Sequence, residues 1–587
     1  MVSKLRIGLV PVLLLIVAAL LYATTPTMAF GFAGMHILVL AVCLGGMVLT
    51  FEEYSGNRPA FAFGAGLVAY LVLCFVMTLE MGRSDTFRDL VGQREFGKFT
   101  QDVAPIDVAQ IRVVDQEMAR RIGEKLLGEE SALGSSAKLG TMAIQHVAGR
   151  LYWVAPVLHS GFFAWNKFSD GTPGYVKVSA TNPNDFEFVR KVGGKDVRIR
   201  YQPEAYFGDD LERHLWLNGF ASVGLTDFTF EIDDEGNPFY VVTLYGLKIG
   251  WSGEDAVGVA VVDVRTGEIR NYPIDKAPQW IDRIQPDDFV FEQLKLWGEY
   301  QDGWLNLSGN KKLKPAHEPL FVHGSDGRGY WYVGISSKGK EGAITGFAMV
   351  DSRTKAFKFY EVAGTTESAA QQSVLGKVRE KNYAASNPVL YNVAGHPTYV
   401  MSLKDGAGLV KMVGMADVRD HSVVGVGDTV RDALRSYLSA QNAKGNAAVP
   451  DAHARKASVS GTVERIGTDV RGGNSLTYFT VSGQSGKAFV ADTGISPDVA
   501  VTRVGDSVDV EFVAASPLGY FQASAFRNRT LGISPAPAQV AKTAETEAVR
   551  DRAQRRQDVR EADSKWEKLA PEEKAEALGK LDSVRKK

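Results

Sequence analysis

Hydrophobic and polar positions divide the chain into an apolar first stretch and a long remainder in which the two alternate. Three apolar runs, at about residues 7–23, 30–50 and 60–79, contain no Asp, Glu, Lys or Arg. Each approaches the ~20 residues that cross a bilayer as a helix, whereas a buried helix of a soluble protein usually keeps a polar face. The pattern therefore predicts a transmembrane domain over residues 1–83 with three helices.

The charges that flank these runs predict an orientation. Lys4 and Arg6 before the first run and Arg58 before the third favour the cytoplasmic side, opposed by Arg83 and Arg88. Three crossings from a cytoplasmic amino terminus place the later chain outside. The first run could instead be a cleaved secretory signal, which leaves that location unchanged. We expect a multi-pass protein of the cytoplasmic (inner) membrane with the bulk of the chain extracytoplasmic.

Strand-like alternation recurs through the middle of the chain as an internal repeat. Segments that begin at Gly174, Gly258, Gly346 and Gly414 each contain a strand and a tight turn, clearest in "GVAVVDVRTGEI". Another apolar strand, hairpin turn residues and a helical segment precede each of them. Such a small sheet can bury its apolar face only beneath its own helix. The sequence predicts tandem α+β repeats, each with one helix on a small antiparallel sheet.

These patterns define the expected domain organisation. In chain order the domains are 84–190 (a stalk helix and a first, divergent repeat), 191–276, 277–364 and 365–437 (the second, third and fourth repeats), 438–457 (a linker), 458–531 (a small β-barrel) and 532–587 (a charged tail, helical or disordered). The linker is predicted from its Ala, Asn and Ser content. The tail is predicted from charges of both signs at helical spacing.

The second repeat, "FYVVTLYG…GVAVVDVRTGEIRNY", resembles the PepSY family and its TseB-like relatives. The resemblance rests on Asp263, Thr266, Gly267 and Glu268, while the third repeat has Lys355 where the family pattern has glycine. It implies a cystatin-like fold with a helix on a small antiparallel sheet. It also implies a bacterial envelope protein whose extracytoplasmic modules are non-catalytic and bind or regulate proteases or cell-wall enzymes.

Residues 458–531 contain five short strands separated by Gly and Ser turns, a pattern similar to the OB fold. Barrels of this type often bind oligonucleotides or oligosaccharides through a basic groove. Six basic residues are opposed by seven acidic ones in this segment, and the net charge of the whole chain is −2. This balance argues against nucleic-acid binding and favours a structural or protein-binding barrel.

No combination of residues in the sequence is typical of catalysis, of a metal site or of a cofactor site. Cys43 and Cys74 both lie in apolar runs, which argues against a disulfide framework and against a thiolate metal site. His317 and His323 in "HEPLFVH" have neither the HExxH pattern nor i,i+4 spacing. We interpret them as satisfied or surface histidines.

Two aspartates invite a catalytic interpretation that their positions do not favour. Asp263 and Asp351 occupy equivalent places in separate repeats, directly before the tight turn. An aspartate at that place commonly caps the turn by accepting hydrogen bonds from the next backbone N–H groups. We therefore predict a turn-capping role for both residues.

Tryptophans in loops are the better candidates for a binding surface. Trp251 in "KIGWSGED" and Trp304 in "YQDGWLNLSGN" occupy polar, Gly-rich surroundings. Many other tryptophans of the repeats are expected to hold helix to sheet, whereas a loop tryptophan can anchor a partner. Trp251 and Trp304 are the predicted partner contacts.

These features predict a membrane-anchored, non-enzymatic, protein-binding scaffold, or a regulator of a cell-envelope assembly or envelope enzyme, without a cofactor. The alternative is a membrane-tethered protein that binds nucleic acid or glycan through the OB-like barrel. An enzymatic function stays open, because the lack of a catalytic motif in one sequence is weak evidence against catalysis. The identity of the protein partner and self-association into a homo-oligomer stay open as well.

Overall fold

The structure is a computed structural model. It describes residues 15–50, 58–79, 82–92, 94–103, 106, 110–130, 133–305, 312–324, 327–337, 343–444, 456–471, 474–484, 486–493, 495–513 and 520–532. The chain forms two compact units, Met1–Ala457 with Val513–Ser524, and Ser458–Phe512 with Ala525–Lys587. The predicted tail beyond residue 532 and most of the predicted linker lie outside the described residues.

The fold class predicted from the sequence is wrong. The described chain is predominantly β, with many sheets, and one described helix, Phe61–Thr78, is long and apolar enough to cross a membrane by length and composition. The described helices at the other two predicted spans, Leu15–Thr24 and Ala33–Gly46, are shorter. The finding indicates membrane association through α3 (Arg58–Thr78).

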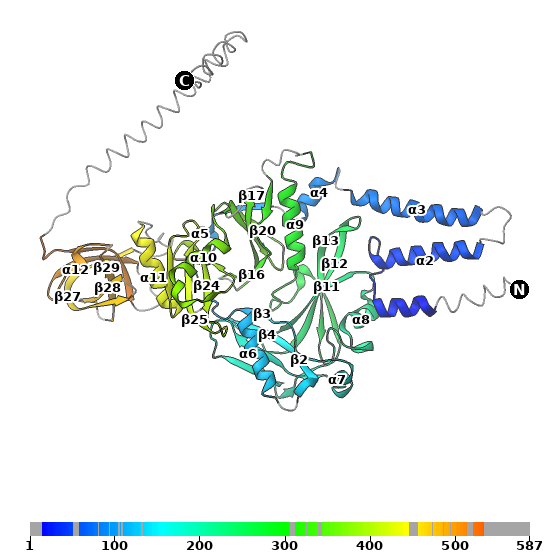
Figure 1. Cartoon of the computed structure of the whole chain (residues 1–587), viewed down its shortest axis with the longest axis horizontal. Helices are drawn as coiled ribbons and strands as arrows, with labels where there is room; N and C mark the ends of the chain where they lie inside the picture. Colours follow the sequence, from blue (N-terminus) through cyan, green and yellow to red (C-terminus); the bar gives the residue numbers. More distant parts are fainter. Residues whose placement is uncertain are drawn as a thin grey trace, which may run out of the picture. The chain divides into compact units, whose positions relative to one another are not determined.

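Four larger sheets follow one another along the first compact unit (Figure 1). The first sheet contains β2 (Ala137–Leu139), β3 (Ala143–Val147), β4 (Arg150–His159), β6 (Tyr175–Ser179) and β7 (Phe186–Val189). The second contains β11 (Gly224–Ile232), β12 (Pro238–Ile249), β13 (Ser252–Asp263) and β14 (Ile269–Pro273). In the second sheet each strand pairs antiparallel with the next along the chain, as in a meander.

The third and fourth sheets lie further along the chain. The third contains β1 (Arg94–Gly97), β15 (Leu313–Pro315), β16 (Leu320–His323), β17 (Gly329–Ser337), β19 (Gly346–Asp351) and β20 (Phe357–Tyr360). The fourth contains β22 (Ala384–Ala385), β23 (Val389–Val393), β24 (His396–Lys404), β25 (Val410–Asp417) and β26 (Val424–Gly427). Helix α9 (Asp287–Glu299) packs on the third sheet, and α10 (Glu367–Lys377) and α11 (Val430–Ala443) pack on the fourth.

The tight turn that recurs in the sequence has the same cap in each of these sheets. Asp263 Oδ1 accepts hydrogen bonds from two backbone N–H groups of its turn, and Asp351 and Asp417 do the same in theirs. In the first sheet the hydroxyl of Ser179 replaces the carboxylate. The predicted turn-capping role of Asp263 and Asp351 is confirmed. Lys355, where the second repeat has glycine, adopts a left-handed φ of 63°.

The glycines that mark the repeat are required by close approach of neighbouring backbone. A Cβ atom at Gly174, Gly258 or Gly346 would collide with a carbonyl oxygen of the next strand, and one at Gly414 would collide with Val374 of α10. Any larger residue would push the strand pair or the helix apart. The recurring glycine is therefore a packing feature of the sheets.

The segment after α3 does not form the predicted stalk. Strand β1 pairs in parallel with β20 of the third sheet, and Phe99 and Ile111 are buried in the core shared by the third and fourth sheets. Helix α6 (Gln116–Gly128), capped by Asp115, packs on the first sheet. Apolar residues spaced among the charges allow this segment to pack against the sheets of the folded part.

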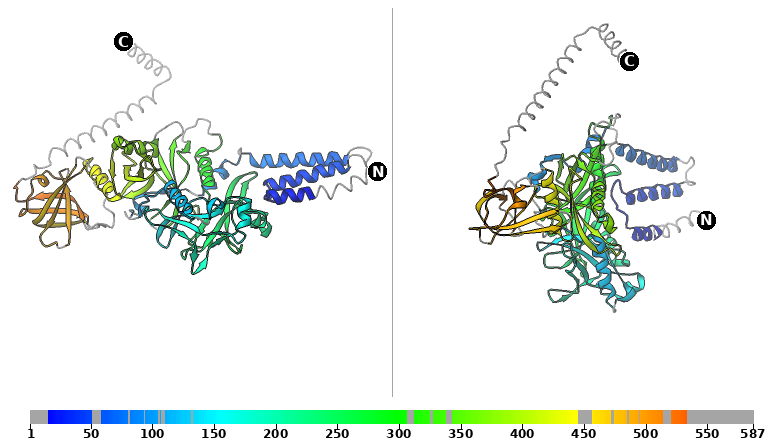
Figure 2. Two further views of the ribbon diagram at one scale, coloured as in Figure 1. Left: turned by 60° about the horizontal axis from the view of Figure 1, so that its bottom comes forward. Right: turned by 60° about the vertical axis from the view of Figure 1, so that its left-hand side comes forward.

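The apolar helices contact the second sheet and the helix before it. The indole N–H of Trp216 donates to Pro26 O (2.9 Å), and the backbone N–H of Trp251 donates to Thr78 Oγ1 at the end of α3 (2.9 Å). Helices α2 (Ala33–Thr50) and α3 lie side by side in all ribbon views (Figure 2). The second sheet therefore contacts the end of α3, and the helical segment before that sheet contacts the turn before α2.

A closed barrel with strand order β27–β28–β29–β31–β30 makes up most of the described part of the second compact unit. Its strands are β27 (Lys456–Arg471), β28 (Asn474–Val481), β29 (Ala488–Asp492), β30 (Ser507–Val513) and β31 (Tyr520–Asn528). Closure leaves no exposed strand edge. On the barrel, Arg529 forms an ion pair with Asp509, so this cation is already neutralised.

Candidate functional site

A groove of about 610 Å³ lies between the third and fourth sheets. One wall is the connection from β15 to β16, residues 314–320. The other wall is formed by the start of α10, residues 366–368 and 371, and by residues 387 and 388 before β23. A volume of this size lies within the range of small-ligand and short-peptide sites.

An ion pair forms the floor of the groove, and two buried tyrosines lie beneath it. His317 Nε2 lies 2.8 Å from Glu367 Oε1, the first residue of α10. The hydroxyls of Tyr332 in β17 and Tyr399 in β24 donate to the same oxygen at 2.8 and 3.0 Å. Thr366 caps α10 by accepting from Ala369 N (3.4 Å). The capped helix thus places one carboxylate where side chains of both sheets converge.

Burial and hydrogen bonding oppose each other at this ion pair, and hydrogen bonding prevails. Burial alone would lower the pKa of His317, but its bond to Glu367 holds that pKa above the ordinary value. Burial alone would raise the pKa of Glu367, but His317 holds it below the ordinary value. The ionised pair is therefore the favoured state in mildly acidic solution.

The imidazole of His317 has a partner in either protonation state. Nδ1 lies 2.6 Å from Glu318 O, so that nitrogen carries a proton. When protonated, Nε2 donates to Glu367; when neutral, it can accept from Gly334 N–H, which lies 3.1 Å away. The floor of the groove can therefore lose one positive charge without leaving a nitrogen unsatisfied.

The arrangement is suited to binding more than to bond-breaking chemistry. Burial raises the pKa values of Tyr332 and Tyr399 well above the ordinary value, so both hydroxyls remain protonated donors. The groove has no cysteine among its lining residues, and its serines are not paired with His317. Among the described residues no group of three His, Cys, Asp or Glu could hold a metal ion. The groove thus combines a fixed carboxylate with polar and apolar lining residues, a mixture typical of a binding site.

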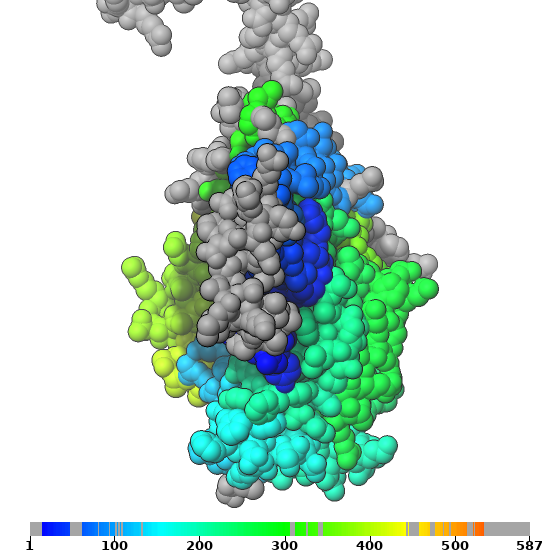
Figure 3. Space-filling view, turned by 90° about the vertical axis from the view of Figure 1, so that its right-hand side faces the viewer, coloured from blue at the N-terminus to red at the C-terminus, as the bar shows by residue number. Residues whose placement is uncertain are grey.

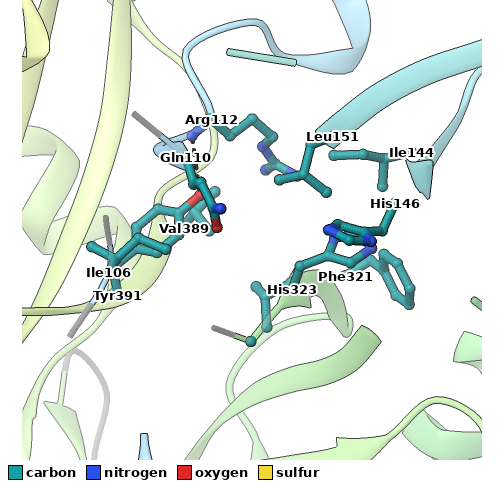
Figure 4. Close-up of a pocket in the computed structure, with 12 residues that line it drawn as sticks. Ile106, Gln110, Arg112, Ile144, His146, Leu151, Phe321, His323, Val389 and Tyr391 are labelled. Atoms are coloured by element: carbon teal, nitrogen blue, oxygen red, sulfur yellow. Dashed lines mark hydrogen bonds between the residues drawn. The ribbon is translucent and has the colours of Figure 1, made fainter. Parts of the chain in front are cut away.

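A second, smaller cavity lies where segments of the first, third and fourth sheets meet. Figure 4 shows His146, His323 and the guanidinium of Arg112 around one space. Its volume is about 20 Å³, room for about one water molecule. Burial lowers the pKa of Arg112 and of His146. This space is too small for a substrate or peptide, so the groove is the better candidate site.

The sequence-predicted site residues lie apart from the groove and from each other. Trp251 is 36% exposed at the tip of the β12–β13 hairpin, beside His36 of α2. Trp304 is 44% exposed after α9. Neither lines the groove. Both remain predicted contacts, and the position of Trp251 beside the apolar helices favours a role at the membrane surface over one in protein recognition.

Sequence reasoning did not find the groove. His317 and His323 were interpreted as satisfied or surface residues, and each is indeed satisfied, by Glu367 and by Asp282 respectively. The missing information was the partner of His317, which lies fifty positions later in the next repeat. A single sequence holds no signal for such a pairing.

Comparisons with known proteins provide no family for this chain. No family model and no curated protein matches it. Among solved structures, a levansucrase mutant from B. megaterium is similar over 72% of this chain and 98% of its own, with 9% identity and a TM-score of 0.17. A similarity this low carries no argument about fold or function.

Proposed function

We propose that the chain is a membrane-associated, non-enzymatic scaffold or regulator of a bacterial envelope assembly, and that it binds an extended segment of a partner protein in the groove. The observation that carries this proposal is the prearranged floor of the groove. Glu367 is held by His317, Tyr332 and Tyr399 before any partner arrives. Preorganisation of this kind lowers the entropic cost of binding.

The walls of the groove favour a polypeptide over an apolar small molecule. Residues 314–320, 387 and 388 line it, among them the polar Lys314, Glu318 and Asn387. An extended peptide can satisfy such mixed donors and acceptors with its own N–H and C=O groups. The PepSY-like interpretation of the repeats, which implies protein-binding modules, remains part of the proposal.

On the same proposal the folded part lies outside the cytoplasm. Arg58 begins α3 and favours a cytoplasmic position for that end of the helix, as Lys4 and Arg6 do for the amino terminus, against Arg83 and Arg88 beyond the other end of α3. Crossing from the side of Arg58, α3 leads outward. A reporter enzyme that works only in the cytoplasm, fused after Lys587, should be inactive; activity would contradict this location.

Site-directed crosslinking tests the groove itself. A photoreactive amino acid at Ser368, which is exposed at the rim, should give a defined adduct with a partner in native membranes. The same amino acid at Ser422, exposed in a turn of the fourth sheet, serves as the control position. Identical adducts from both positions would contradict groove-specific binding.

A groove-filling variant makes the test independent of adduct chemistry. Asn387→Trp adds bulk at an exposed lining residue and should abolish the Ser368 adduct. Gln372→Trp adds the same bulk to an exposed residue of α10 that does not line the groove, and should leave the adduct intact. An adduct that persists in Asn387→Trp would overturn the proposal.

A further inference from the structure

Five aromatic residues form a surface cluster at the edge of the first compact unit. This juxtamembrane aromatic cluster consists of Phe162, Phe163, Trp165, Tyr206 and Phe207. Phe162 contacts Phe163, Trp165 and Tyr206 with ring centroids 5.8, 5.7 and 5.2 Å apart, and Trp165 contacts Phe207 at 5.7 Å. The rings come from α7 (Phe162–Lys167) and from the segment before α8 (Leu211–Leu215).

The cluster exposes apolar surface that water does not favour. Phe163 is 87% exposed, Phe207 58% and Phe162 44%. Contiguous exposed rings of this kind mark interaction sites on soluble surfaces. Phe207 also holds a left-handed φ of 53°, an uncommon conformation for a bulky residue. The polar end of the cluster is fixed, since Trp165 Nε1 donates to Asp209 Oδ2 (3.0 Å).

Arg213 connects this cluster to the apolar helices. Its Nη1 donates to Phe207 O and its Nε to Tyr22 O, both at 3.0 Å. Tyr22 belongs to the helix Leu15–Thr24, and the guanidinium lies 4.9 Å from the Tyr22 ring centroid. The cluster therefore lies beside the end of an apolar helix. The space-filling view looks at the face from which the apolar helices rise (Figure 3).

The second sheet relates this position to the membrane-crossing helix. Trp216, directly after α8, donates a hydrogen bond to Pro26 O, and Trp251 of the same repeat is hydrogen-bonded to Thr78 at the end of α3. The end of α3 and the cluster are thus anchored to neighbouring parts of one fold. A bilayer crossed by α3 has its surface at Thr78, because the apolar helix ends there.

We propose that the juxtamembrane aromatic cluster inserts into the headgroup region of the bilayer that α3 crosses. Aromatic side chains are favoured at that depth because rings lie among the upper acyl chains while Trp N–H and Tyr O–H groups reach polar partners. Lys167 at the end of α7 lies at the headgroup level, where a long cationic side chain is accommodated. The inference goes beyond the proposed function and holds whether or not the groove binds a partner.

Depth measurement in a lipid disc tests the proposal. The full chain, with Cys43→Ser and Cys74→Ser, is placed one copy per phosphatidylcholine nanodisc, and a nitroxide is attached at Phe163→Cys. Collision of the label with membrane-soluble oxygen should be severalfold more frequent than with the water-soluble nickel chelate. A label at Leu409→Cys, at a residue 50% exposed in the β24–β25 hairpin, should show the reverse preference.

A second labelled variant keeps the result decisive. Phe207→Cys provides a separate probe of the cluster if Phe163→Cys fails to fold. Water-like accessibility at either folded variant, equal to that at Leu409→Cys, would overturn the proposal. A third outcome is a label shielded from both reagents, with spin–spin broadening in discs that hold several copies and none in single-copy discs. This outcome would show that a second copy of this chain covers the cluster, and it would overturn the proposal too.

Discussion

The backbone N–H of Asp282 donates to Oε2 of Glu231 at 3.1 Å, which places two carboxyl groups together inside the protein. Asp282 Oδ2 in turn accepts from His146 N (2.6 Å) and lies 3.2 Å from His323 Nε2. Residues of the first, second and third sheets thus meet at one loop. The junction is buried, with Glu231 1% and Asp282 6% exposed.

This junction should make the protein less stable as pH rises. Burial, reinforced by Asp282, raises the pKa of Glu231 from 4.5 to about 8. Between those values the folded chain keeps a proton that the unfolded chain releases, so stability falls with rising pH. We expect a loss on the order of 5 kcal/mol across the interval, seen as a falling midpoint of thermal unfolding of the full chain.

A neutral replacement isolates the contribution of this group. Glu231→Gln cannot ionise, so most of the slope between pH 4.5 and 8 should disappear in that variant. Glu235→Gln, in the exposed turn between β11 and β12, is the matched control and should keep the slope. An unchanged slope in Glu231→Gln would show that other groups bind the proton.

The ion pair in the groove should have its own pH window. The lowered pKa of Glu367 contributes stability above about pH 4.5 that is lost as pH falls through the folded value. The raised pKa of His317 contributes stability below about pH 6.5 that is lost as pH rises through its folded value. Both contributions to stability are fully present between pH 4.5 and 6.5. Because the floor of the groove is then ionised and ordered, the yield of the crosslinked adduct from Ser368 should be highest in this interval.

Removing one partner of this pair should cost more than removing both. His317→Gln leaves Glu367 buried without its cation, at a cost on the order of 3 kcal/mol near pH 5.5. The double variant His317→Gln with Glu367→Gln should recover part of that loss, because no buried charge remains. Unfolding curves of the wild type, both single variants and the double variant provide the coupling energy. A coupling energy near zero would contradict the ion pair.

Local features of the repeats could be predicted from the sequence because they are encoded within a few residues. The cap at Asp263 needs only the next backbone N–H groups, and the glycine at Gly258 is explained by the adjacent strand. The groove could not be predicted, since His317 and Glu367 belong to different repeats. Sequence separation of this kind is resolved only by three-dimensional packing.

The prediction of three spanning helices failed for a related reason. Hydropathy records the apolar character of residues 7–23 and 30–50, of which the described apolar helices Leu15–Thr24 and Ala33–Gly46 cover only part. Met28 N donates to Ala221 O in the predicted link between these runs, a contact with the second repeat that hydropathy cannot predict. Likewise, strand β1 could not be predicted within the polar segment after α3, because its pairing partner β20 lies far along the chain.

The turn caps should differ in strength according to burial. Asp351 is 5% exposed, whereas Asp263 is partly exposed. Asp263→Ala should cost about 1 kcal/mol of stability, and Asp351→Ala about 2 kcal/mol, because the hydrogen bonds of Asp351 are partly buried whereas those of Asp263 are exposed. Asn at either position keeps the accepting oxygen and should restore most of the loss in thermal unfolding. Equal losses at both sites would contradict the burial argument.

The contribution of one hydroxyl group, that of Thr78, to the contact between α3 and the second sheet should be measurable. Thr78 Oγ1 accepts from Trp251 N (2.9 Å) and donates to Cys74 O (2.8 Å). Thr78→Val keeps the shape but removes both bonds, which should cost about 1 kcal/mol locally, or roughly fivefold in amide exchange at Trp251. Exchange would be followed by mass spectrometry of the full chain in nanodiscs.

Thr24→Val is the control. It removes a hydroxyl that bonds only to Leu20 O, within its own helix, and should leave exchange at Trp251 unchanged. Equal protection of Trp251 in the wild type and in Thr78→Val would show that other contacts hold the hairpin tip, and the hydroxyl would then have no part in joining the folded unit to its membrane helix.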